Sequence, residues 1–485
     1  MKKKLFFIFT TALLFSTAIF AEELSPAQTL PDTTTLLLSY VENDSELKNL
    51  TLAAKKAALS YESAKIDAGF DVTLSSGTVT LKTSDDGNTL TAKPSVKASL
   101  PQASNLSVTA QTNYYSDSSD SASDASSLSD TSVSVGVDII SSVTISNKLT
   151  KLKAERSVTE AQRKIEKRAI AAEKEFYTEL KELLTSINTI MTKRQTLYED
   201  SLDLEAKKVQ GYSKASSTYR QAELKVISDQ HEIESAIHSF KHDCVVFYKK
   251  CGYDLNLEID DKTELMSFVP QGIDEIEPAD VTTFDKELYS EIESANWTYY
   301  INSMERSSKK SFSLSANAGY TFDNSTTNSD SIDAGLSGTI GGLTLGAGVS
   351  MPVGNSTSPS YTFSATLTPN TFRKNSITKQ QNELTEEQEL LAIQTAETAY
   401  ETKVVELQEK LDTLFWEKKT ADENISMYAD LEKDMANLYK QGYISETEYL
   451  SSKNNLNSSI IKKISNLIDL IIYNDDVISN FVSDK

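Results

Sequence analysis

The chain has little cysteine, histidine and tryptophan: its 485 residues include two cysteines, three histidines and two tryptophans. Cys244 and Cys251 are seven residues apart on a helical pattern. Helical rise alone would place their α-carbons about 10 Å apart, beyond the reach of a disulfide. We interpret both as small core residues, and no disulfide framework is expected. His231, His238 and His242 share one helical stripe without a third ligand beside any pair, so no metal site is predicted.

Long hydrophobic runs and excess positive charge are also absent. After Phe20 no stretch approaches the 18 apolar residues of a transmembrane helix, so this chain can meet a membrane only as a closed β-barrel or at its surface. The formal net charge is -22, which disfavours nucleic acid as a partner. No nucleophile, base and acid stand in a catalytic arrangement, so we expect neither an enzyme nor a cofactor.

Residues 1–21 have the pattern of a secretory signal peptide. Three lysines follow Met1, an apolar run extends from Leu5 to Phe20, and a polar chain begins after Ala21. We therefore expect cleavage after Ala21 and export of the remaining chain.

Two segments, residues 70–145 and 311–369, alternate apolar and polar residues with a period of two. In the second segment the alternation from Phe312 to Phe322 lasts eleven residues, the length of a tilted transmembrane strand. We count four alternating stretches in each segment, and each would form a strand with one apolar and one polar face. Asp85-Asp86-Gly87-Asn88 is typical of a hairpin turn.

The tract from Ser116 to Ser132 interrupts the first segment. It consists almost entirely of Ser, Asp and Ala, and so has too little apolar content to pack. We expect a solvated loop there.

Helical periodicity flanks both segments. We predict one helix over residues 36–68 and a second over residues 147–210, with a heptad seam that includes Phe176, Leu180 and Ile187. A helix of about 64 residues is about 96 Å long. After Gly211 a return helix carries apolar residues to Cys251. The second half repeats this order, with a helix over about 284–310 and a long helical hairpin after the strands.

Helix, strands, long helix, glycine turn and return helix thus occur twice, which indicates a duplicated half-protein. The first repeat is residues 22–252, an acidic connector spans 253–283, and the second repeat is 284–485. An even number of strands returns the chain to the side from which it entered. Because lipid cannot satisfy the groups at a sheet edge, a sheet in a membrane must close. The predicted fold class is a membrane α+β protein with a β-barrel and long helical hairpins.

These features together resemble the TolC-type outer-membrane efflux protein family over essentially the whole mature chain. The resemblance rests on the signal, the two-fold repeat and both glycine turns. It also rests on the segments Asn43-Asp44-Ser45-Glu46-Leu47, Phe176-Tyr177 and Ala399-Tyr400. It implies a homotrimer whose strands form one shared β-barrel in the lipid of the outer membrane. A long periplasmic α-helical coiled-coil barrel would continue that β-barrel.

The resemblance also implies two kinds of site. In the family, a Val-Gly-Leu-like core at the periplasmic turns meets an adaptor (membrane fusion) protein. Gln210-Gly211-Tyr212 and Gln441-Gly442-Tyr443 occupy those places, so an adaptor matched to tyrosine is implied.

Acidic residues six and nine positions after the second glycine ring the closed aperture in the family. Glu448 fills the first position and Ser451 the second, so one acidic ring is expected. An alternative interpretation of Glu448 is a solvated carboxylate near a helix N-terminus, where negative charge is favourable.

The number of strands departs from the family, which usually has two per repeat and twelve per trimer. Four stretches per repeat leave two possibilities open. Either the barrel has about 24 strands, or some strands form accessory hairpins.

The function predicted from the sequence is that of an outer-membrane exit duct. It would serve a tripartite efflux or type I secretion system and conduct substrates passively from an inner-membrane transporter. The alternative is a surface-exposed structural or adhesive barrel protein with a periplasmic scaffold, which the Ser/Asp-rich loop favours.

Overall fold

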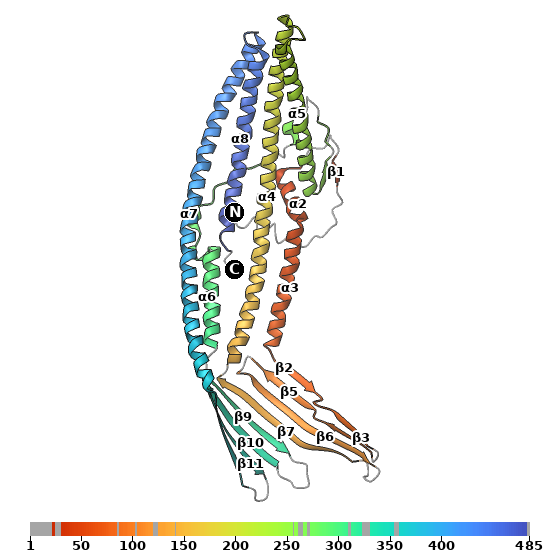
Figure 1. Cartoon of the computed structure of the whole chain (residues 1–485), viewed down its shortest axis with the longest axis vertical. Helices are drawn as coiled ribbons and strands as arrows, with labels where there is room; N and C mark the ends of the chain where they lie inside the picture. Colours follow the sequence, from red (N-terminus) through yellow and green to blue (C-terminus); the bar gives the residue numbers. More distant parts are fainter. Residues whose placement is uncertain are drawn as a thin grey trace. The chain divides into compact units, whose positions relative to one another are not determined.

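The structure is a computed structural model, shown in Figure 1, and the chain divides into two compact units. Unit 1 comprises residues 1–50, 163–289 and 401–485, and unit 2 comprises residues 51–162 and 290–400. The predicted signal peptide lies outside the residues that the structure describes. These are residues 22–24, 31–84, 87–101, 104–119, 125–140, 142–255, 257–259, 265–268, 272–308, 312–322, 330–353 and 358–482.

Unit 1 is built from helices, three of which continue into unit 2. The helices are α2 (Thr33–Asn43), α3 (Ser45–Asp67), α4 (Ser142–Val209), α5 (Ser217–Lys250), α7 (Pro369–Lys440) and α8 (Glu446–Ser479). The connector after α5 contains β8 (Tyr253–Leu255), which pairs in parallel with β1 (Glu22–Leu24). Its described residues also contain the 3₁₀ turns η1 (Leu265–Phe268) and η2 (Val281–Thr283). A further 3₁₀ turn, η3 (Lys286–Leu288), follows the connector, so the α-helix predicted over about 284–310 begins only at Ser290.

The core of unit 1 follows the predicted heptad seam of α4. Phe176, Leu180 and Ile187 are fully buried, and they pack with residues of α2, α5 and α8. Phe176 lies between Tyr40 of α2 and Phe247 of α5, with ring centroids 5.6 and 5.2 Å away. Aromatic rings at these separations add to the stabilisation from burial.

Cys244 and Cys251 belong to this core as buried free thiols, which confirms their interpretation as core residues. Burial raises the pKa of each thiol to about 12. Both side chains therefore stay protonated and unreactive at neutral pH.

The predicted helix over residues 36–68 is wrong in one respect, because it is divided at Asp44. The Asp44 carboxylate accepts a hydrogen bond of 2.6 Å from the Leu47 backbone N–H, and the Asp44 N–H donates to the carbonyl of Val41. An aspartate that accepts from the third following amide begins a new helix. Asp44 therefore ends α2 and starts α3.

Unit 2 contains one antiparallel sheet, together with α6 (Ser290–Ser308) and parts of α3, α4 and α7. The strands are β2 (Asp71–Ser75), β3 (Thr80–Ser84), β4 (Gly87–Ala92), β5 (Ser95–Leu100), β6 (Leu106–Ser119), β7 (Ala125–Ile140), β9 (Phe312–Phe322), β10 (Asp330–Ile340), β11 (Leu343–Val353) and β12 (Ser360–Leu367). Both predicted strand segments thus meet in one sheet.

The ten strands occupy eight positions across the sheet, four from each segment. The order is β12-β11-β10-β9-β7-β6, and β6 then pairs with both β4 and β5. β3 and β2 pair in turn with β4 and β5. β4 with β5, and β3 with β2, are therefore two long strands, each interrupted once. Gly77, in the second interruption, has a φ of +60°, which glycine adopts without strain.

The predicted loop over residues 116–132 is wrong for most of its length. β6 continues to Ser119 and β7 begins at Ala125, with Asn113 opposite Ser129 and Asp117 opposite Ala125. Residues 120–124 lie outside the described residues, as do Asp85 and Asp86 of the predicted hairpin turn. Backbone hydrogen bonds between long neighbouring strands stabilise this polar sequence, although composition alone favours a loop. The feature that favoured the adhesive alternative is therefore largely strand.

Candidate functional site

The two glycine turns end α4 and α7 with the same backbone geometry. Gly211 and Gly442 have φ values of +80° and +76°. The N–H of Tyr212 donates to the Lys207 carbonyl at 3.2 Å, and that of Tyr443 donates to Leu438 at 3.0 Å. The glycine N–H groups donate one turn back, to Lys208 and Tyr439. These are the paired hydrogen bonds of a Schellman motif, which requires a residue in the left-handed region.

The predicted docking residues all lie on the surface. Gln210, Gly211, Gln441 and Gly442 are exposed. Tyr212 exposes 45% of its surface and Tyr443 exposes 76%, although tyrosine usually buries its ring. A Cβ built on either glycine would meet no atom within 4 Å. The turns therefore present two tyrosines and open backbone, a surface to which another protein can bind.

Glu448, the predicted aperture residue, closes the first turn of α8. Its carboxylate accepts hydrogen bonds of 2.9 Å from both the N–H and the hydroxyl of Ser445, and the Ser445 hydroxyl accepts from the Glu448 N–H at 3.3 Å. This is a capping box, in which two otherwise unpaired amides at the helix start are satisfied. The hydrogen bond from the Ser445 backbone lowers the pKa of Glu448, so its charge persists in mild acid. Ser451, the second predicted aperture residue, is half-buried one turn later.

The two turns differ in charge. The first carries Lys207, Lys208, Lys214 and Arg220 within ten residues of Gly211, and its return helix begins at Ser216 without an acidic capping partner. The second has Glu446 and Glu448 in the first turn of α8. A basic turn and an acidic turn thus share one backbone motif.

Tyrosines that the sequence reasoning missed connect these helices. The rings of Tyr439 and Tyr449 stack across the α7–α8 turn, with centroids 5.3 Å apart and planes 4° apart. Tyr449 donates to Glu432 at 3.2 Å. Tyr198 of α4 donates to Glu446 of α8 at 2.6 Å, and this hydrogen bond raises the Tyr198 pKa to about 12. The contact joins the two hairpins, and no periodicity in the sequence indicates it.

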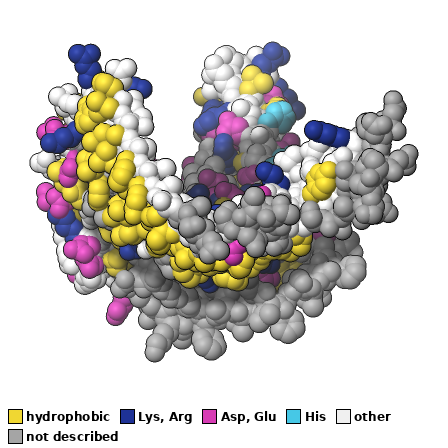
Figure 2. Space-filling model, turned by 90° about the horizontal axis from the view of Figure 1, so that it is seen from below, with side chains coloured by type: hydrophobic (Ala, Val, Ile, Leu, Met, Phe, Trp, Pro, Cys, Tyr) yellow, Lys and Arg dark blue, Asp and Glu magenta, His cyan; other side chains and the backbone are white. Residues whose placement is uncertain are grey.

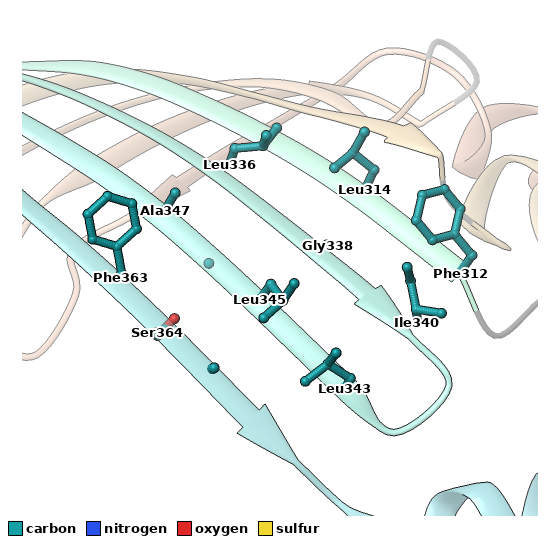
Figure 3. Close-up of a pocket in the computed structure, with 12 residues that line it drawn as sticks. Phe312, Leu314, Leu336, Gly338, Ile340, Leu343, Leu345, Ala347, Phe363 and Ser364 are labelled. Carbon is teal, nitrogen blue, oxygen red and sulfur yellow. The ribbon is translucent and has the colours of Figure 1, made fainter.

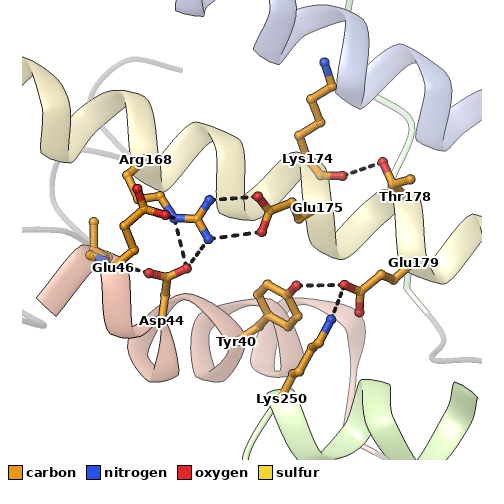
Figure 4. Close-up of polar contacts among 10 residues, drawn as sticks. Tyr40, Asp44, Glu46, Arg168, Lys174, Glu175, Thr178, Glu179 and Lys250 are labelled. Carbon is orange, nitrogen blue, oxygen red and sulfur yellow. Dashed lines mark hydrogen bonds and ion pairs between the residues drawn. The ribbon is translucent and has the colours of Figure 1, made fainter. Parts of the chain in front are cut away.

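A second polar cluster lies at the break between α2 and α3 (Figure 4). Arg168 of α4 contacts Asp44 and Glu46, and it donates to both oxygens of Glu175 at 2.7 and 3.0 Å. Burial alone would raise the pKa of Asp44, but Arg168 and the backbone N–H groups of Leu47 and Glu46 together outweigh it and lower the pKa. The segment that carries the family resemblance is thus fixed to α4 by a charge-assisted network.

Beside it, Tyr40 of α2 donates to Glu179 of α4 at 3.1 Å, and Lys250 of α5 donates to the same carboxylate oxygen at 2.5 Å. Burial, followed by the Glu179 charge, raises the pKa of Tyr40. Three helices therefore meet at one carboxylate.

The sheet of unit 2 has one apolar and one polar face. One row of directly opposed residues crosses all eight positions and is apolar throughout, namely Val72, Ala98, Val108, Val135, Ala318, Ala334, Val349 and Tyr361. The adjacent row faces the other way and holds Thr73, Lys97, Thr109, Ser134, Gly319, Asp333, Ser350 and Ser360. The alternation predicted for single strands thus extends across the whole sheet.

The apolar face is exposed. Figure 2 shows hydrophobic side chains in one continuous curved band. Phe363 of β12 is 81% exposed and Leu74 of β2 is 76% exposed. A groove of about 520 Å³ lies in this face, where the small residues Gly338 and Ala347 stand among Leu336, Leu345 and Phe363 (Figure 3). An apolar surface of this extent marks a site of contact with a membrane or another protein.

Two further findings concern membranes and metals. None of the helices in the described ranges is long and apolar enough to cross a membrane. Among the same residues, no three His, Cys, Asp or Glu side chains are grouped to hold a metal ion.

Solved structures similar to this chain include membrane proteins from three bacteria. A membrane protein from Pseudomonas aeruginosa is 14% identical, with a TM-score of 0.45, over 96% of this chain and 100% of that one. The outer membrane protein VceC of Vibrio cholerae is 11% identical, with a TM-score of 0.46, over 93% and 97% of the two chains. The open state of the Neisseria gonorrhoeae MtrE outer membrane channel is 12% identical, with a TM-score of 0.46, over 96% and 94%.

No curated protein matches the sequence. Two family models match it, and they adjoin without a gap. Residues 36–273 match the TP096X N-terminal domain, and residues 274–484 match the TP096X C-terminal domain. From residue 36 to residue 484 the chain consists of these two domains, and it belongs to the TP096X family.

Proposed function

We propose that this chain is an outer-membrane channel of the TolC type, the exit duct of a tripartite efflux or type I secretion system. It conducts substrates passively, and an inner-membrane transporter supplies the energy. The observation that carries the proposal is the sheet of unit 2, in which one whole face is apolar and exposed while the other is polar. Such a sheet separates lipid from a water-filled lumen when it closes.

The dimensions of the sheet support contact with lipid. β9, β10 and β11 each have eleven residues, which span about 28 Å across a membrane at a tilt of about 40°. Aromatic side chains stand at both ends of this length on the apolar face. Phe312 lies at the end of β9 nearest α6, and Tyr320 lies at the other end with Phe322 beside it. Aromatic girdles at both interfaces are typical of membrane barrels.

Closure of the sheet supports an assembly of several copies. The sheet is open in one chain, and its edge groups require partners in lipid. The resemblance to the TolC type implies a homotrimer with one shared barrel in the outer membrane. The helical hairpins would then form the periplasmic tube that continues it, and the two related halves of the chain would each supply one hairpin.

The two glycine turns are proposed to bind a periplasmic adaptor protein. Tyr212 and Tyr443 are exposed aromatic side chains on rigid turns, and tyrosine is among the residues that contribute most to protein interfaces. Alanine at both positions is expected to weaken adaptor binding at least ~10-fold. Gln210→Ala with Gln441→Ala is the matched control, because it leaves both rings in place. Unchanged binding by the double tyrosine variant, measured with an intact oligomer, would refute the docking site.

Glu448 and Ser451 are proposed to line the closed aperture. Three copies of Glu448 around one axis would attract cations and repel one another. Because Glu448 also caps α8, its charge has to be tested apart from its cap. Glu448→Gln retains an acceptor for the capping box but removes the charge, whereas Ser445→Ala weakens the cap and retains the charge. We expect Glu448→Gln alone to relieve block by divalent cations, and equal block in both variants would exclude an aperture role.

The proposed function as a whole is tested by conductance. The purified full-length mature chain is reconstituted in a planar bilayer, and substrate accumulation is measured in a strain that lacks it. We expect discrete conductance steps in the bilayer and a raised intracellular substrate concentration in the strain that lacks the protein. A chain that inserts but does not conduct, with accumulation unchanged, would reject the duct.

A further inference from the structure

The sheet of unit 2 ends in strands that are paired on one side only. β12 is hydrogen-bonded to β11, while β2 and β3 are hydrogen-bonded to β5 and β4. Neither edge has a second neighbour among the described strands. An edge strand presents a row of unpaired N–H and C=O groups, which lipid leaves unsatisfied at a cost of several kcal/mol each. Both edges therefore need a partner strand.

We infer that β12 of one copy of this chain pairs with β2 and β3 of the next copy, so that all eight strand positions belong to the barrel wall. The inference rests on the proposed function, because it takes this sheet to lie in a membrane. It identifies the surfaces through which copies join and the number of strands each contributes.

The direction of the two edges fits this pairing. β2 follows α3 and leads away from the helical end of the sheet, whereas β12 leads into α7 at that end. Two such strands are antiparallel when they lie side by side. Every neighbouring pair in the sheet is already antiparallel, so the new contact continues the same pattern.

The faces of the two edges also fit. Val72 and Leu74 lie on the apolar face of β2, and Phe363, Ala365 and Leu367 lie on the apolar face of β12. Pairing that places these residues opposite one another makes the apolar band continuous from copy to copy. A register shift by one residue would turn the apolar side chains of one edge strand into the lumen. Such a shift is therefore strongly disfavoured.

Both edges have few of the features that usually prevent strands from pairing. β12 contains no proline and no charged residue, and all its residues are exposed. β2 is likewise exposed throughout and carries one charged residue, Asp71 at its start, and β3 carries one, Lys82. Edges that stay unpaired are normally protected by charge, proline or a covering element.

The length of the strands argues against accessory hairpins outside the membrane. β6 and β7 have 14 and 16 residues, and the interrupted strands span residues 71–84 and 87–100. Each exceeds the 9–11 residues that a tilted strand needs to cross. Removing the β2–β5 positions from the wall would also expose the apolar row at Val72 and Ala98 to water.

Closure of one chain upon itself is disfavoured for another reason. A barrel of eight strands has an interior just wide enough for its own side chains, and so contains no duct. Three copies instead give 24 strands. With strands about 4.8 Å apart at a tilt of about 40°, such a barrel is about 48 Å across between backbones, against about 24 Å for twelve strands.

Disulfide formation between copies tests the edge pairing. Full-length chains with Val72→Cys are mixed before assembly with chains carrying Phe363→Cys, Ala365→Cys or Leu367→Cys. Membranes that contain the mixed chains are then oxidised, and the linked products are analysed without reductant. We expect linked dimers with one of the three partners, at a yield at least ~10-fold above Thr73→Cys, which faces the lumen. The parent chain is a further control, since its own two thiols are buried.

The outcomes separate this inference from the proposed function. Chains that carry both Val72→Cys and the best β12 cysteine should in turn link into trimers. Such chains linking only within one chain, or same-face pairs that link no better than Thr73→Cys, would overturn the edge pairing even if the protein conducts. Linked trimers that do not conduct would instead sustain the pairing and reject the duct. A density map of the assembly gives an independent result, because eight strands per chain are expected and four would refute the inference.

Discussion

The two return helices, α5 and α8, are alike in form and different in what they bury. Each has 34 residues and begins at a serine cap just after a Gly-Tyr turn. The buried side chains of α5 are apolar or aromatic: Tyr219, Ala222, Ile233, Phe240, Cys244, Phe247 and Tyr248. Those of α8 include five polar residues, Ser452, Ser459, Ser465, Asn466 and Asp475.

The polar atoms of α8 are also incompletely paired. Both amide atoms of Asn466, the hydroxyl of Tyr473 and one carboxylate oxygen of Asp475 are buried without a hydrogen-bond partner among the described residues. Each such group costs about 1–3 kcal/mol. α5 leaves one such atom, Oδ2 of Asp229, and otherwise buries apolar and aromatic side chains, so its surface is suited to the core of one chain. We expect α8 to find its remaining partners outside the chain, in a neighbouring copy or in water.

The largest expected contrast between the helices is in core truncation. Phe240→Ala on α5 removes a fully buried ring and should lower the free energy of unfolding by about 3–5 kcal/mol. Ser459→Ala on α8 removes only a hydroxyl that donates to the Asn455 carbonyl one turn back, and we expect a change within about 0.5 kcal/mol. Native-state hydrogen exchange of unit 1 measures both. Equal losses would mean that the two helices share one kind of core.

Asp475 should make the α8 side sensitive to pH. Burial, and then the Glu173 charge, raise its pKa to about 8. The contribution of Asp475 to the free energy of unfolding is therefore greatest below its ordinary pKa of 3.8. It is lost as pH rises through about 8. Asp475→Asn should remove this dependence and stabilise the chain by about 1–3 kcal/mol at pH 9.

Asp476 is the matched control for this experiment. It pairs with Lys174 at 2.6 Å and with Lys410 at 2.7 Å. Burial raises its pKa, but these two partners outweigh it and lower the pKa. Asp476→Asn should therefore destabilise the chain at neutral pH. An Asp475→Asn variant that behaves in the same way would contradict the burial argument.

Substitution of the glycine should have the same effect at both turns, because the two hairpins end in the same backbone motif. Alanine at Gly211 or Gly442 forces a side chain into the left-handed region and should cost about 1 kcal/mol at each turn. The two costs should agree, since a Cβ meets no neighbour at either turn. Asparagine should cost less than alanine at both. Exchange rates of the last amides of α4 and α7 report the effect, and an unequal cost would reveal a contact specific to one turn.

The smallest expected contrast lies in the helix starts. Ser216→Ala and Ser445→Ala should each cost about 1 kcal/mol locally. Only α8 has an acidic capping partner, and the hydrogen bond from Ser445 lowers the pKa of Glu448. The stabilisation it provides is present above its ordinary value of 4.5 and is lost as pH falls through the lowered value. Exchange of the first amides of α8 should therefore accelerate in acid relative to those of α5, and parallel behaviour would refute the capping role.

Periodicity and turn residues made the elements of this fold predictable. The seam through Phe176 and the alternation from Phe312 to Phe322 depend on local repetition, which a sequence displays directly. The Ser/Asp tract shows no such repetition, because its strands are stabilised by hydrogen bonds to the neighbouring backbone and not by their own side chains. Composition therefore predicted a loop where pairing across the sheet dominates.

The candidate site was predictable only in part. Ser445 and Glu448 have the spacing of a capping box, and Asp44 precedes Leu47 as a helix cap does, so both features were readable from sequence. The hydrogen bond from Tyr198 to Glu446 and the burial of Asp475 were not, because they depend on how α8 packs against α4. The positions of Gly211 and Gly442 were correct because glycine is the residue that ends helices in this way.

The open edges of the sheet also affect the chain before it assembles in the membrane. A single copy in water exposes the apolar face of its sheet and edge strands with free backbone groups, the arrangement that seeds aggregation. Such a chain has to be kept from contact with other copies until it inserts into lipid. We therefore expect a chaperone to bind it before insertion. The same strands that complete the wall would otherwise precipitate the protein.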